Sequence, residues 1–444
     1  MADSDKKILD LNRFDATETG DSLDYAERVK RRAATFGASS VLFYDNPVEM
    51  ERGEGAYLVD VAGTVYLDAY NNVPSVGHCH PRVVEAVSRQ MGQLNIHTRY
   101  LSHVVETYAE RLLATFPTEL SNVVMTCTGS EANDLAMRIS QAVSGGQGFI
   151  VTEAAYHGNT ALVTEISPSS LRRRGPASFV RTIPAPSGTD PSMIAASFKA
   201  SVEAAIADLQ NSGIAIAGLI VDTIFSSDGI YADPAGFLAP AVNAVRKAGG
   251  LFIADEVQPG FGRTGAGMWG VSRHGIVPDV VTMGKPMGNG FPMGGVVTRP
   301  EHLSLFCEDT GYFNTFGGNP VAAAAGLAVL DVIAEERLIE NAQLVGSYFL
   351  EGLADLRTRK ARVGPIRGAG LFVGVDLTAG DDGAVDPAFT VNVINAMKRR
   401  GVLVGAAGKN GSTLKIRPPL CFTQSNVDFF LEQFSSALLE AEPR

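Results

Sequence analysis

A series of short, continuous apolar runs in the middle of the chain constrains the fold more than any other feature. These runs lie at residues 122–127, 148–153, 216–222, 250–257 and 280–284. Continuous apolar runs are typical of strands that are covered on both faces, and stretches with helical periodicity separate them here. The alternation of strand and helix predicts an α/β fold with a mostly parallel central sheet in a large domain.

The last part of the chain has a different pattern. After about residue 330, a helix-like stretch is followed by the segments "RGAGLFVGVDL", "FTVNVINAMKRRG", "VLVGAAG" and "TLKIRPPL". Mixed short strands and helices of this kind predict a smaller α+β domain. The first 40 or so residues are polar, and we expect them to form arms over the surface.

Composition limits the partners and the compartment. The formal net charge of −11 argues against nucleic acid or an anionic membrane as the main partner, because both require a basic surface. Four widely spaced cysteines without a C-x-x-C pair, and an N-terminus without an apolar core, favour a reduced, cytoplasmic chain over a secreted one. The longest apolar run, 321–330, is too short to span a membrane.

A buried strand that ends on two carboxylates is the first candidate site. The run "GLFIADEV" brings Asp255 and Glu256 to a carboxyl strand end, where ligands bind in open α/β sheets. A buried carboxylate is costly without a cationic partner. That partner is either a structural arginine such as Arg263 or the positive charge of a ligand.

Glycines follow this strand, and "GFGRTG" has the G-x-G-x-x-G spacing of a dinucleotide-binding loop. Such a loop follows its strand directly and opens a helix, whereas here five residues intervene and "AGMWGVSRHG" does not read as a helix start. We therefore expect a loop that passes close to something bulky. A nucleotide-linked oxidoreductase stays a remote alternative.

The segment "TGSEANDLAMRISQAV" predicts a helix over 131–143, because its apolar residues recur at helical spacing. Thr128 and Glu131 have the spacing of a capping box. The backbone N–H groups at such a helix start, together with the Ser130 hydroxyl, make an anion site suited to phosphate. An ordinary capped helix without a ligand is the alternative.

A lysine and an arginine also stand at predicted strand ends. Lys285 follows a buried strand between Gly284 and Pro286, where burial would lower its pKa and favour Schiff-base chemistry; the alternative is an ordinary loop lysine. Arg417 ends the short strand in "LKIRPPL", and a rigidly held arginine suits bidentate binding of a carboxylate. A surface salt bridge is its more common role.

Two histidines in "GHCHP" raise the question of a metal. One residue separates His78 from His80, and no carboxylate lies at ligand spacing beside them. Zinc sites normally combine three or four ligands at recognisable spacings. We therefore expect no metal.

One cofactor accounts for the strand-end groups together. Pyridoxal 5'-phosphate (PLP) requires a phosphate anchor, an anion at its pyridine nitrogen and an amine that holds its aldehyde. The sequence offers Gly129 with Ser130, Asp255 and Lys285 for these three tasks. At these positions the chain resembles the class III (subgroup II) aminotransferases of fold type I, and the resemblance extends from about Leu42 to Leu439.

Specific motifs carry this resemblance. They are "TGSEAND", "AYHG", "ADEVQPGFGRTG", "TMGKPMGNGFP", "NTFGGNP", "RGAGLFVGVDL" and "KIRPPL". Within the class, "NNVPSVGHCHP", "TRYL", "MGKPMGNG" and "KIRPPLCFT" are most similar to the alanine–glyoxylate aminotransferase 2-like branch, which also contains phospho-lyases. The resemblance implies a large PLP-binding domain, residues 76–329, and a small domain that joins residues 1–75 to residues 330–444. It also implies a homodimer with shared active sites.

The resemblance assigns roles around the cofactor ring. Lys285 would form the Schiff base and later move the proton, and Asp255 would keep the pyridine nitrogen protonated. Val257 and Tyr156 would lie on the two faces of the ring, and Gln258 would reach its phenolic oxygen. The glycine loop after Asp255 would lie over the cofactor.

It also assigns the ends of the ligand. Gly129 and Ser130 would hold the phosphate, with Thr315 added from the neighbouring subunit, and Arg417 would bind a substrate carboxylate. Further residues are expected at the same site, one at the cofactor and two at the substrate: His157, Tyr70 and Asn72.

The segment "VDTIFSSDGI" departs from the family pattern. The first glutamate of the family is shortened to Asp222, and the position of the second, which neutralises the substrate arginine in γ-aminobutyrate and ornithine enzymes, is Ser227. Arg417 therefore lacks its usual partner unless Asp228 replaces it. This weakens the case for those two substrates.

The expected reaction is transamination from an amine or ω-amino acid to a small 2-oxo acid, pyruvate or glyoxylate. The nearer alternative is a PLP-dependent phospho-lyase acting on a phosphorylated amine, which would need a cationic site for the substrate phosphate. "SPSSLRRRGP" offers Arg172, Arg173 and Arg174 for that purpose, although we expect a solvated basic loop.

Overall fold

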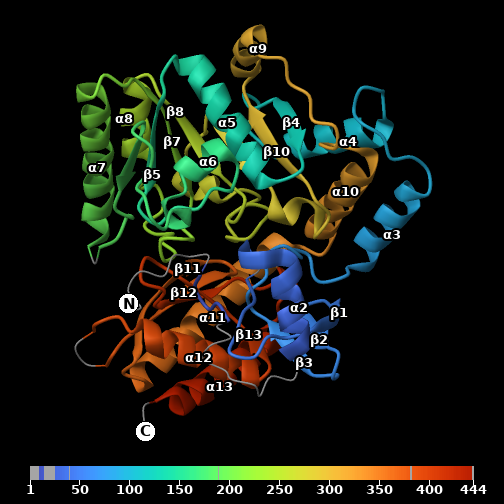
Figure 1. Ribbon diagram of the computed structural model, residues 1–444, viewed down its shortest axis with the longest axis vertical. Coiled ribbons are helices and arrows are strands. Elements are labelled where there is room, and N and C mark those ends of the chain that lie inside the picture. The colour runs from blue at the N-terminus through green and yellow to red at the C-terminus, as the bar shows by residue number, and fades with distance from the viewer. Residues whose placement is uncertain (1–9, 15–25, 40, 189, 381–382, 443–444) are drawn as a thin grey trace.

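The computed structural model describes residues 10–14, 26–39, 41–188, 190–380 and 383–442 (Figure 1). Two regions lie one above the other in this view, with a large sheet and its helices above and two small sheets with their helices below. No helix in the described ranges is both long and apolar enough to cross a membrane.

The upper region is built on a seven-stranded sheet of order β4-β10-β9-β8-β7-β5-β6. Its strands are β4 (Asn122–Thr126), β5 (Gly148–Thr152), β6 (Val180–Ile183), β7 (Ile216–Asp222), β8 (Leu251–Asp255), β9 (Val280–Met283) and β10 (Gly294–Thr298). β10 is antiparallel to both of its neighbours, and the other neighbouring pairs are parallel. The predicted α/β fold with a mostly parallel sheet is confirmed.

Helices cover this sheet on both faces, as its continuous apolar strands require. The helices of the upper region are α3 (Pro81–Met91), α4 (His103–Leu113), α5 (Gly129–Ser144), α6 (Ala161–Glu165), α7 (Pro191–Asn211), α8 (Ala239–Lys247), α9 (Pro300–Asp309) and α10 (Pro320–Glu335). α5 packs against β7, β9 and β10, while α7 packs against its neighbour α8 (Figure 1). The first four residues of β8, 251–254, are apolar and buried. The first side chain of this strand that can make a polar contact with a ligand is therefore Asp255, at its carboxyl end.

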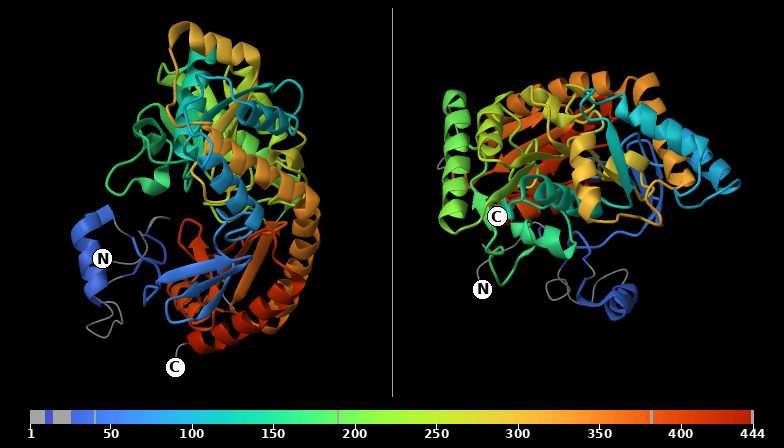
Figure 2. Two further views of the ribbon diagram at one scale, coloured as in Figure 1. Left: turned by 90° about the vertical axis from the view of Figure 1, so that its right-hand side faces the viewer. Right: turned by 90° about the horizontal axis from the view of Figure 1, so that it is seen from above.

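The lower region joins both ends of the chain. β1 (Met50–Glu54), β2 (Tyr57–Asp60) and β3 (Val65–Asp68) form a sheet with β13 (Val402–Leu403), which pairs with β3 in parallel. A second, antiparallel sheet contains β11 (Val363–Ala369), β12 (Phe372–Leu377), β14 (Gly405–Ala407) and β15 (Thr413–Ile416). The left view of Figure 2 shows the N-terminal strands beside the C-terminal elements.

Helices α11 (Leu338–Arg359), α12 (Pro387–Arg399) and α13 (Gln424–Ala441) complete the lower region. α2 (Ala26–Phe36) buries none of its residues and lies at the outside, while most of the N-terminal arm that we expected falls outside the described residues. The domain limits expected from the sequence stay a prediction; the one at 329/330 falls inside α10.

Candidate active site

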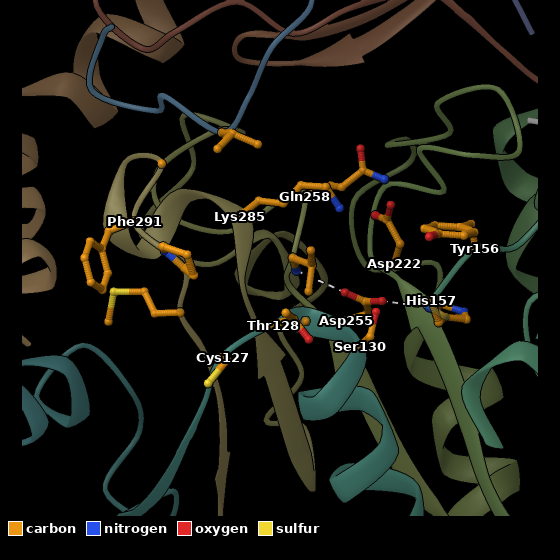
Figure 3. A pocket seen from close by; sticks show the side chains of 17 residues that line it. Cys127, Thr128, Ser130, Tyr156, His157, Asp222, Asp255, Gln258, Lys285 and Phe291 are labelled. Carbon is orange, nitrogen blue, oxygen red and sulfur yellow. Dashed lines mark hydrogen bonds and ion pairs between the residues drawn. The ribbon is translucent and has the colours of Figure 1, made fainter. Parts of the chain in front are cut away.

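A cavity of about 290 Å³ opens at the carboxyl ends of the central strands (Figure 3). Its wall is formed by the junction of β4 and α5, the loop after β5, the ends of β7 and β8, the start of the turn after β9, and residues 290–293. Eight of the nine residues expected around the cofactor line this one cavity: Gly129, Ser130, Tyr156, His157, Asp255, Val257, Gln258 and Lys285.

The N-terminus of α5 forms the floor on the phosphate side. α5 begins at Gly129, two residues earlier than predicted, with Thr128 as the cap whose Oγ1 accepts the Glu131 N–H at 3.2 Å. The predicted capping box is wrong in one half, because the Glu131 carboxylate accepts the N–H of Cys127 at 2.8 Å instead of that of Thr128. The same carboxylate accepts Asn314 Nδ2 at 2.9 Å and so anchors the segment that carries Thr315.

Glycines keep this helix start open. A Cβ on Gly129 would lie 2.8 Å from Val257 Cγ2, and one on Gly158 would lie 2.5 Å from Ser130 Oγ. Ser130 Oγ itself accepts the N–H of Asn159 at 3.2 Å. An exposed helix N-terminus with a hydroxyl and no side chain in the way fits the phosphate of PLP.

Asp255 is 4% exposed and is held from three sides. His157 Nδ1 lies 2.7 Å and Asn133 Nδ2 3.0 Å from its Oδ2, while the N–H of Val257 donates to Oδ1 at 3.0 Å. Burial alone would raise the pKa of this carboxyl, but the hydrogen bond and charge of His157, with the two other donors, leave its pKa below the ordinary value. Asp255 is therefore an anion at neutral pH, which fits a protonated pyridine nitrogen.

The structural alternative for Asp255 is wrong. Arg263, which we named as its possible partner, donates instead to the backbone oxygens of Leu371, at 3.2 Å, and of Pro418. Arg263 therefore makes its hydrogen bonds elsewhere and does not neutralise Asp255. Sequence reasoning missed Asn133, whose signal was a polar residue within the buried face of the predicted helix.

One residue, Gly284, separates Lys285 from β9, and Lys285 is the first position of a 3₁₀ turn, η5 (Lys285–Gly288). Figure 3 shows its side chain extending into the cavity above Asp255. Burial, followed by the positive charge of Arg417, lowers the pKa of Lys285 to about 8, while Asp255 and Asp222 oppose this change. An amine that loses its proton so near neutral pH fits carbonyl chemistry.

Gln258 and Arg417 meet at the upper side of the cavity. Gln258 Nε2 donates to Ser226 Oγ at 2.5 Å, and Gln258 Oε1 accepts from Arg417 Nη1. Arg417 also donates from Nε to the backbone oxygen of Tyr70 at 2.9 Å, and its guanidinium lies 4.7 Å from the centre of the Tyr70 ring. Arg417 is thus held by neutral groups.

Arg417 is only 8% exposed, so the surface salt bridge considered for it is wrong. No ion pair with an acidic side chain is recorded for it in the described part of the chain. Asp228 does not replace the missing glutamate, because its carboxylate accepts Thr152 Oγ1 at 2.7 Å and the N–H of Ala154 at 3.2 Å. Ser227 is buried and gives Arg417 no acid.

Asp222, at the end of β7, lines the cavity, although we had not chosen it as a site residue. Its carboxylate accepts the N–H of Ile224 at 3.1 Å, the N–H of Ser226 at 3.2 Å and the Ser226 hydroxyl. Burial raises the pKa of Asp222. The shorter side chain therefore turns back into its own loop.

Four expected residues are not part of the cavity wall: Arg417, which contacts it through Gln258, and Tyr70, Asn72 and Thr315. Tyr70 lies beside Arg417, and Asn72 is 2% exposed with an Nδ2 that has no partner among the described residues. Thr315 is exposed, on the segment that Asn314 ties to α5. Its expected role in a neighbouring subunit stays a prediction.

The glycine loop after β8 does not lie over the cavity, so that expectation is wrong. A Cβ on Gly262 would lie 2.8 Å from Ile339, and one on Gly265 would lie 2.7 Å from the backbone of Gln343. The loop therefore packs closely on α11, which is the bulky neighbour that the glycines accommodate. Turns and the 3₁₀ segment η4 (Gly270–His274) follow, rather than the helix that a dinucleotide site needs.

The basic loop and the histidines have partners elsewhere. Arg172 pairs with Asp10 and Arg174 with Glu165, each at 2.5 Å, and both arginines are exposed and outside the cavity wall. His78 pairs with Asp68 at 2.7 Å and His80 with Glu336 at 3.0 Å. Among the described residues, no three histidine, cysteine, aspartate or glutamate side chains are grouped so that they could hold a metal ion.

A mostly parallel sheet with an amine, a carboxylate and a helix N-terminus at its strand ends defines a PLP-dependent enzyme of fold type I. The family described as aminotransferase class-III matches residues 43–438. The chain belongs to this family.

Known proteins of two activities are similar to the chain. It is 40% identical over 445 residues to alanine–glyoxylate aminotransferase 2 homolog 2, mitochondrial, of Arabidopsis thaliana, covering 97% of this chain and 91% of that protein. It is 36% identical to ethanolamine-phosphate phospho-lyase homolog 1 of Caenorhabditis elegans, covering 93% of each. A solved phospholyase from Arthrobacter in complex with phosphoethanolamine superimposes with a TM-score of 0.90 at 43% identity, covering 93% of this chain and 99% of that one.

Proposed function

We propose that this class III enzyme moves an amino group from an amine or ω-amino acid to a small 2-oxo acid, pyruvate or glyoxylate. One observation carries the proposal: Lys285 lines the cavity, Arg417 contacts Gln258 on the cavity wall, and the buried guanidinium of Arg417 has no acidic partner within the described residues. A transaminase needs both a reactive amine and a binding site for the carboxylate of its acceptor.

The residues present fit PLP. When bound, it supplies an aldehyde that joins to the amine and a ring that accepts electrons from the neighbouring C–H bond. Gly129 and Ser130 would hold its phosphate, and Asp255, fixed by His157 and Asn133, would hold a proton on the ring nitrogen. Tyr156 and Val257 line the cavity where the ring faces would lie.

Lys285 would act as the general base and general acid of the reaction. Its amine, with a pKa of about 8, would first hold the aldehyde and, once the substrate amine replaces it, would remove and return the proton at the carbon beside the nitrogen. Arg417 would hold the carboxylate of the oxo acid in the second half of the reaction. Gln258, which accepts from Arg417, would keep that guanidinium turned towards the cavity.

The test is a panel of amine donors with pyruvate and with glyoxylate, scored by the keto or aldehyde product and by the new amino acid. The proposal predicts equal amounts of the two products with at least one donor. A holoenzyme that bleaches with no amine on the panel and forms no amino acid would contradict it. Lys409→Ala serves as a control for surface lysines, because Lys409 is exposed and pairs with Glu153.

Elimination of phosphate from a phosphorylated amine is the second candidate. The similarity to the Arthrobacter phospholyase favours it, as does the absence of an acid beside Arg417 among the described residues. In both reactions the proton on the carbon beside the nitrogen would be removed. In elimination, a phosphate on the next carbon would then depart, whereas in transamination the amino group would pass to the oxo acid. Phosphate released without any oxo acid distinguishes this reaction from transamination.

A homodimer with shared sites, in the cytoplasm, completes the proposal. An exposed apolar patch near Thr315 supports the dimer: Leu94, Tyr100, Leu101, Phe313 and Phe316 are between 43% and 96% exposed. Its two segments touch, since Arg99 stacks 3.9 Å from the centre of the Phe313 ring. Four free cysteines are compatible with a reducing compartment.

Complementation tests the shared site. Lys285→Ala and Thr315→Arg would each be inactive alone, but a mixed dimer would contain one intact site if Thr315 serves the opposite subunit. Random mixing then restores about a quarter of wild-type activity, because half of the dimers are mixed. No recovery after verified subunit exchange would mean that Thr315 serves the site of its own subunit, and full activity of Thr315→Arg alone would place it outside the site.

A further inference from the structure

Glu256, the second acid at the end of β8, has no part in the cavity wall. Asp255 lines the cavity, whereas Glu256 is fully buried and does not. Its carboxylate accepts the N–H groups of Gly270 and Val271, each at 2.7 Å, and the Thr223 hydroxyl at 3.2 Å. No ion pair with a cation is recorded for it in the described part of the chain. Because burying a charge is costly, an acid held by neutral donors has to be explained.

Glu256 closes the glycine loop that follows β8. Its carboxylate holds Gly270, 14 residues further along the chain, against the end of the strand. A Cβ on Gly270 would lie 2.6 Å from Pro259 Cβ and 2.7 Å from Thr223 Oγ1, so a side chain there would clash. At the near end, the Glu256 carbonyl oxygen accepts the N–H of Gly260 at 3.1 Å. Both ends of the loop are thus held at one residue.

The far end of this loop is anchored by Trp269, directly before Gly270. Trp269 is 3% exposed, and its Nε1 lies 3.2 Å from the backbone oxygen and 3.1 Å from the hydroxyl of Thr115. Its ring stacks on that of Phe116, with 4.3 Å between the ring centres. It is also the only tryptophan in the sequence. A tryptophan signal therefore reports this point of the loop and no other.

The near end of the loop forms part of the pocket. Val257 and Gln258 follow Glu256 directly, and both line the cavity. The N–H of Val257 donates to Asp255 Oδ1 at 3.0 Å, and Gln258 Oε1 accepts from Arg417 Nη1. The backbone between Asp255 and Gln258 is therefore held by one carboxylate at the cavity and by the other behind it. A displacement of Glu256 would displace two residues of the wall together with the partner of Arg417.

The charge of Glu256 changes near neutral pH. Burial raises its pKa to about 7, and the charge of Asp222 acts in the same direction, while the donors from Gly270, Val271 and Thr223 oppose the change. The ionised carboxylate makes stronger, charge-assisted hydrogen bonds than the neutral acid does. In the neutral acid, the Thr223 hydroxyl can turn and accept the new O–H. Both states are therefore accommodated, but the ionised one holds the loop more firmly.

The neighbouring ionisable groups do not share this behaviour, with one exception. Despite burial, the donors around Asp255 keep its pKa below the ordinary value, so it stays an anion. Burial lowers the pKa of His274 to about 4, so it stays neutral, and Arg273 is paired with an aspartate at 2.6 Å. The exception is Asp222, because burial raises its pKa as well. The test therefore has to distinguish Glu256 from Asp222.

We propose that Glu256 is a positioning residue of this pocket: its ionised carboxylate fixes the loop from Val257 to Val271, and the uptake of a proton loosens Val257 and Gln258 together. The proposal rests on the proposed function for the identity of the pocket. It adds a residue that no substrate or cofactor touches. A glutamine could not replace it, because an amide has one oxygen and would turn an N–H group towards a backbone N–H.

Trp269 gives the direct readout. Fluorotryptophan incorporated into the holoenzyme labels this one position, and its fluorine NMR resonance is followed as the pH is varied. In the wild type the resonance should move with a midpoint near the pKa of Glu256, about 7. Glu256→Gln should remove this movement. The measurement needs no substrate, so it does not depend on which reaction the enzyme catalyses.

Two aspartate variants assign the movement, and they serve even if Glu256→Gln does not fold. Asp222→Asn removes a negative charge that raises the pKa of Glu256, so the midpoint should move to lower pH. Asp228→Asn is the matched control, because burial also raises the pKa of Asp228, to about 6, but its carboxylate accepts from Thr152 and Ala154. It should leave the movement and its midpoint unchanged.

Pyruvate binding connects the loop to the pocket. The dissociation constant of pyruvate from the aminated holoenzyme is measured on the acid and on the alkaline side of the midpoint. The wild type and Asp228→Asn should bind pyruvate several-fold more weakly on the acid side, because the loosened Gln258 no longer fixes Arg417. Glu256→Gln should bind weakly on both sides. A wild type that binds no pyruvate at any pH would contradict the proposed function, whereas the fluorine measurement would still test the loop.

Three outcomes would overturn the proposal. The first is a wild-type resonance that does not move near neutral pH. The second is a movement that persists in Glu256→Gln or disappears in Asp222→Asn, because another group would then be responsible for it. The third is a Glu256→Gln variant that binds pyruvate as the wild type does on both sides of the midpoint, which would limit Glu256 to holding the loop.

Discussion

The two ends of the pocket differ in how their charges are balanced. At one end, Asp255 is surrounded by His157, Asn133 and the backbone of Val257, all within 3.0 Å. Beside the other end, Arg417 is also buried, yet its guanidinium is held by neutral groups among the described residues.

This difference shows which end is complete without its ligand. Burying a charge without a partner destabilises the folded chain, so unmatched buried cations have to be explained by something that binds them. The Asp255 end is preorganised to receive a cofactor that stays, and its charge is already stabilised. Under the proposed function, Arg417 would bind the carboxylate of each incoming oxo acid.

Replacing Lys285 should have the largest effect. Lys285→Ala removes the amine at the centre of the pocket, and no other lysine lines the cavity wall in the described residues. We expect turnover to fall by several powers of ten, while PLP still binds through its phosphate and Asp255. Single-turnover assays and dialysis measure the two properties; retention of more than a few per cent of the activity would place the reactive amine elsewhere.

Asp255→Asn should have the next largest effect. A neutral amide cannot hold a proton on the ring nitrogen, so we expect the rate to fall by about two powers of ten in a folded protein. Asp279→Asn is the matched control, because Asp279 is also a buried, paired aspartate but contacts Arg246 outside the cavity. It should lose stability rather than rate. Equal rate losses in both variants would remove the special role of Asp255.

Arg417→Ala should divide the reaction into its two halves. The first half, with a plain amine, should proceed and bleach the cofactor. The second half, with pyruvate or glyoxylate, should lose about 2–4 kcal/mol of transition-state stabilisation, the value of a charge-assisted bidentate contact. Rapid-mixing absorbance measurements separate the two half-reactions. An equal loss of rate in both would mean that Arg417 maintains the structure of the pocket and does not bind the carboxylate of the oxo acid.

The pH dependence of cofactor uptake gives the smallest effect. The neutral form of Lys285 reacts with the aldehyde, and its pKa is about 8 in the empty pocket. The rate of reconstitution of the cofactor-free protein should therefore rise with pH, about tenfold between one pH unit below that value and well above it, and then level off. Arg417→Ala should move the midpoint upwards, because the nearby positive charge is lost.

Much of the fold was predictable because buried parallel strands are continuous in apolar residues and end on polar ones. The five predicted strands occur as β4, β5, β7, β8 and β9 within two residues at each end, and β7 matches 216–222. β10 was not predicted: it begins with two glycines, and a Cβ on Gly294 would lie 2.5 Å from the backbone of Thr128. This strand is short, and its residues show no hydrophobic pattern that distinguishes them from the neighbouring segments.

The site was predictable to the extent that each group stands at a strand end. Asp255, Lys285 and Ser130 were found in this way, and they meet at one cavity. The contacts between distant segments were not predictable, because local sequence carries no signal for them. Examples are Asn133 with Asp255, Gln258 with Arg417, and the glycine loop with α11.

The central claim, that the two ends of the pocket serve different ligands, is tested most directly by measuring two dissociation constants in two variants. PLP is titrated into the cofactor-free protein, and pyruvate is titrated into the aminated holoenzyme, for Asp255→Asn and for Arg417→Gln. Asp255→Asn should weaken PLP at least about tenfold and change pyruvate little; Arg417→Gln should do the reverse. If Arg417→Gln releases PLP as readily as Asp255→Asn does, or leaves the affinity for pyruvate unchanged, the account is contradicted.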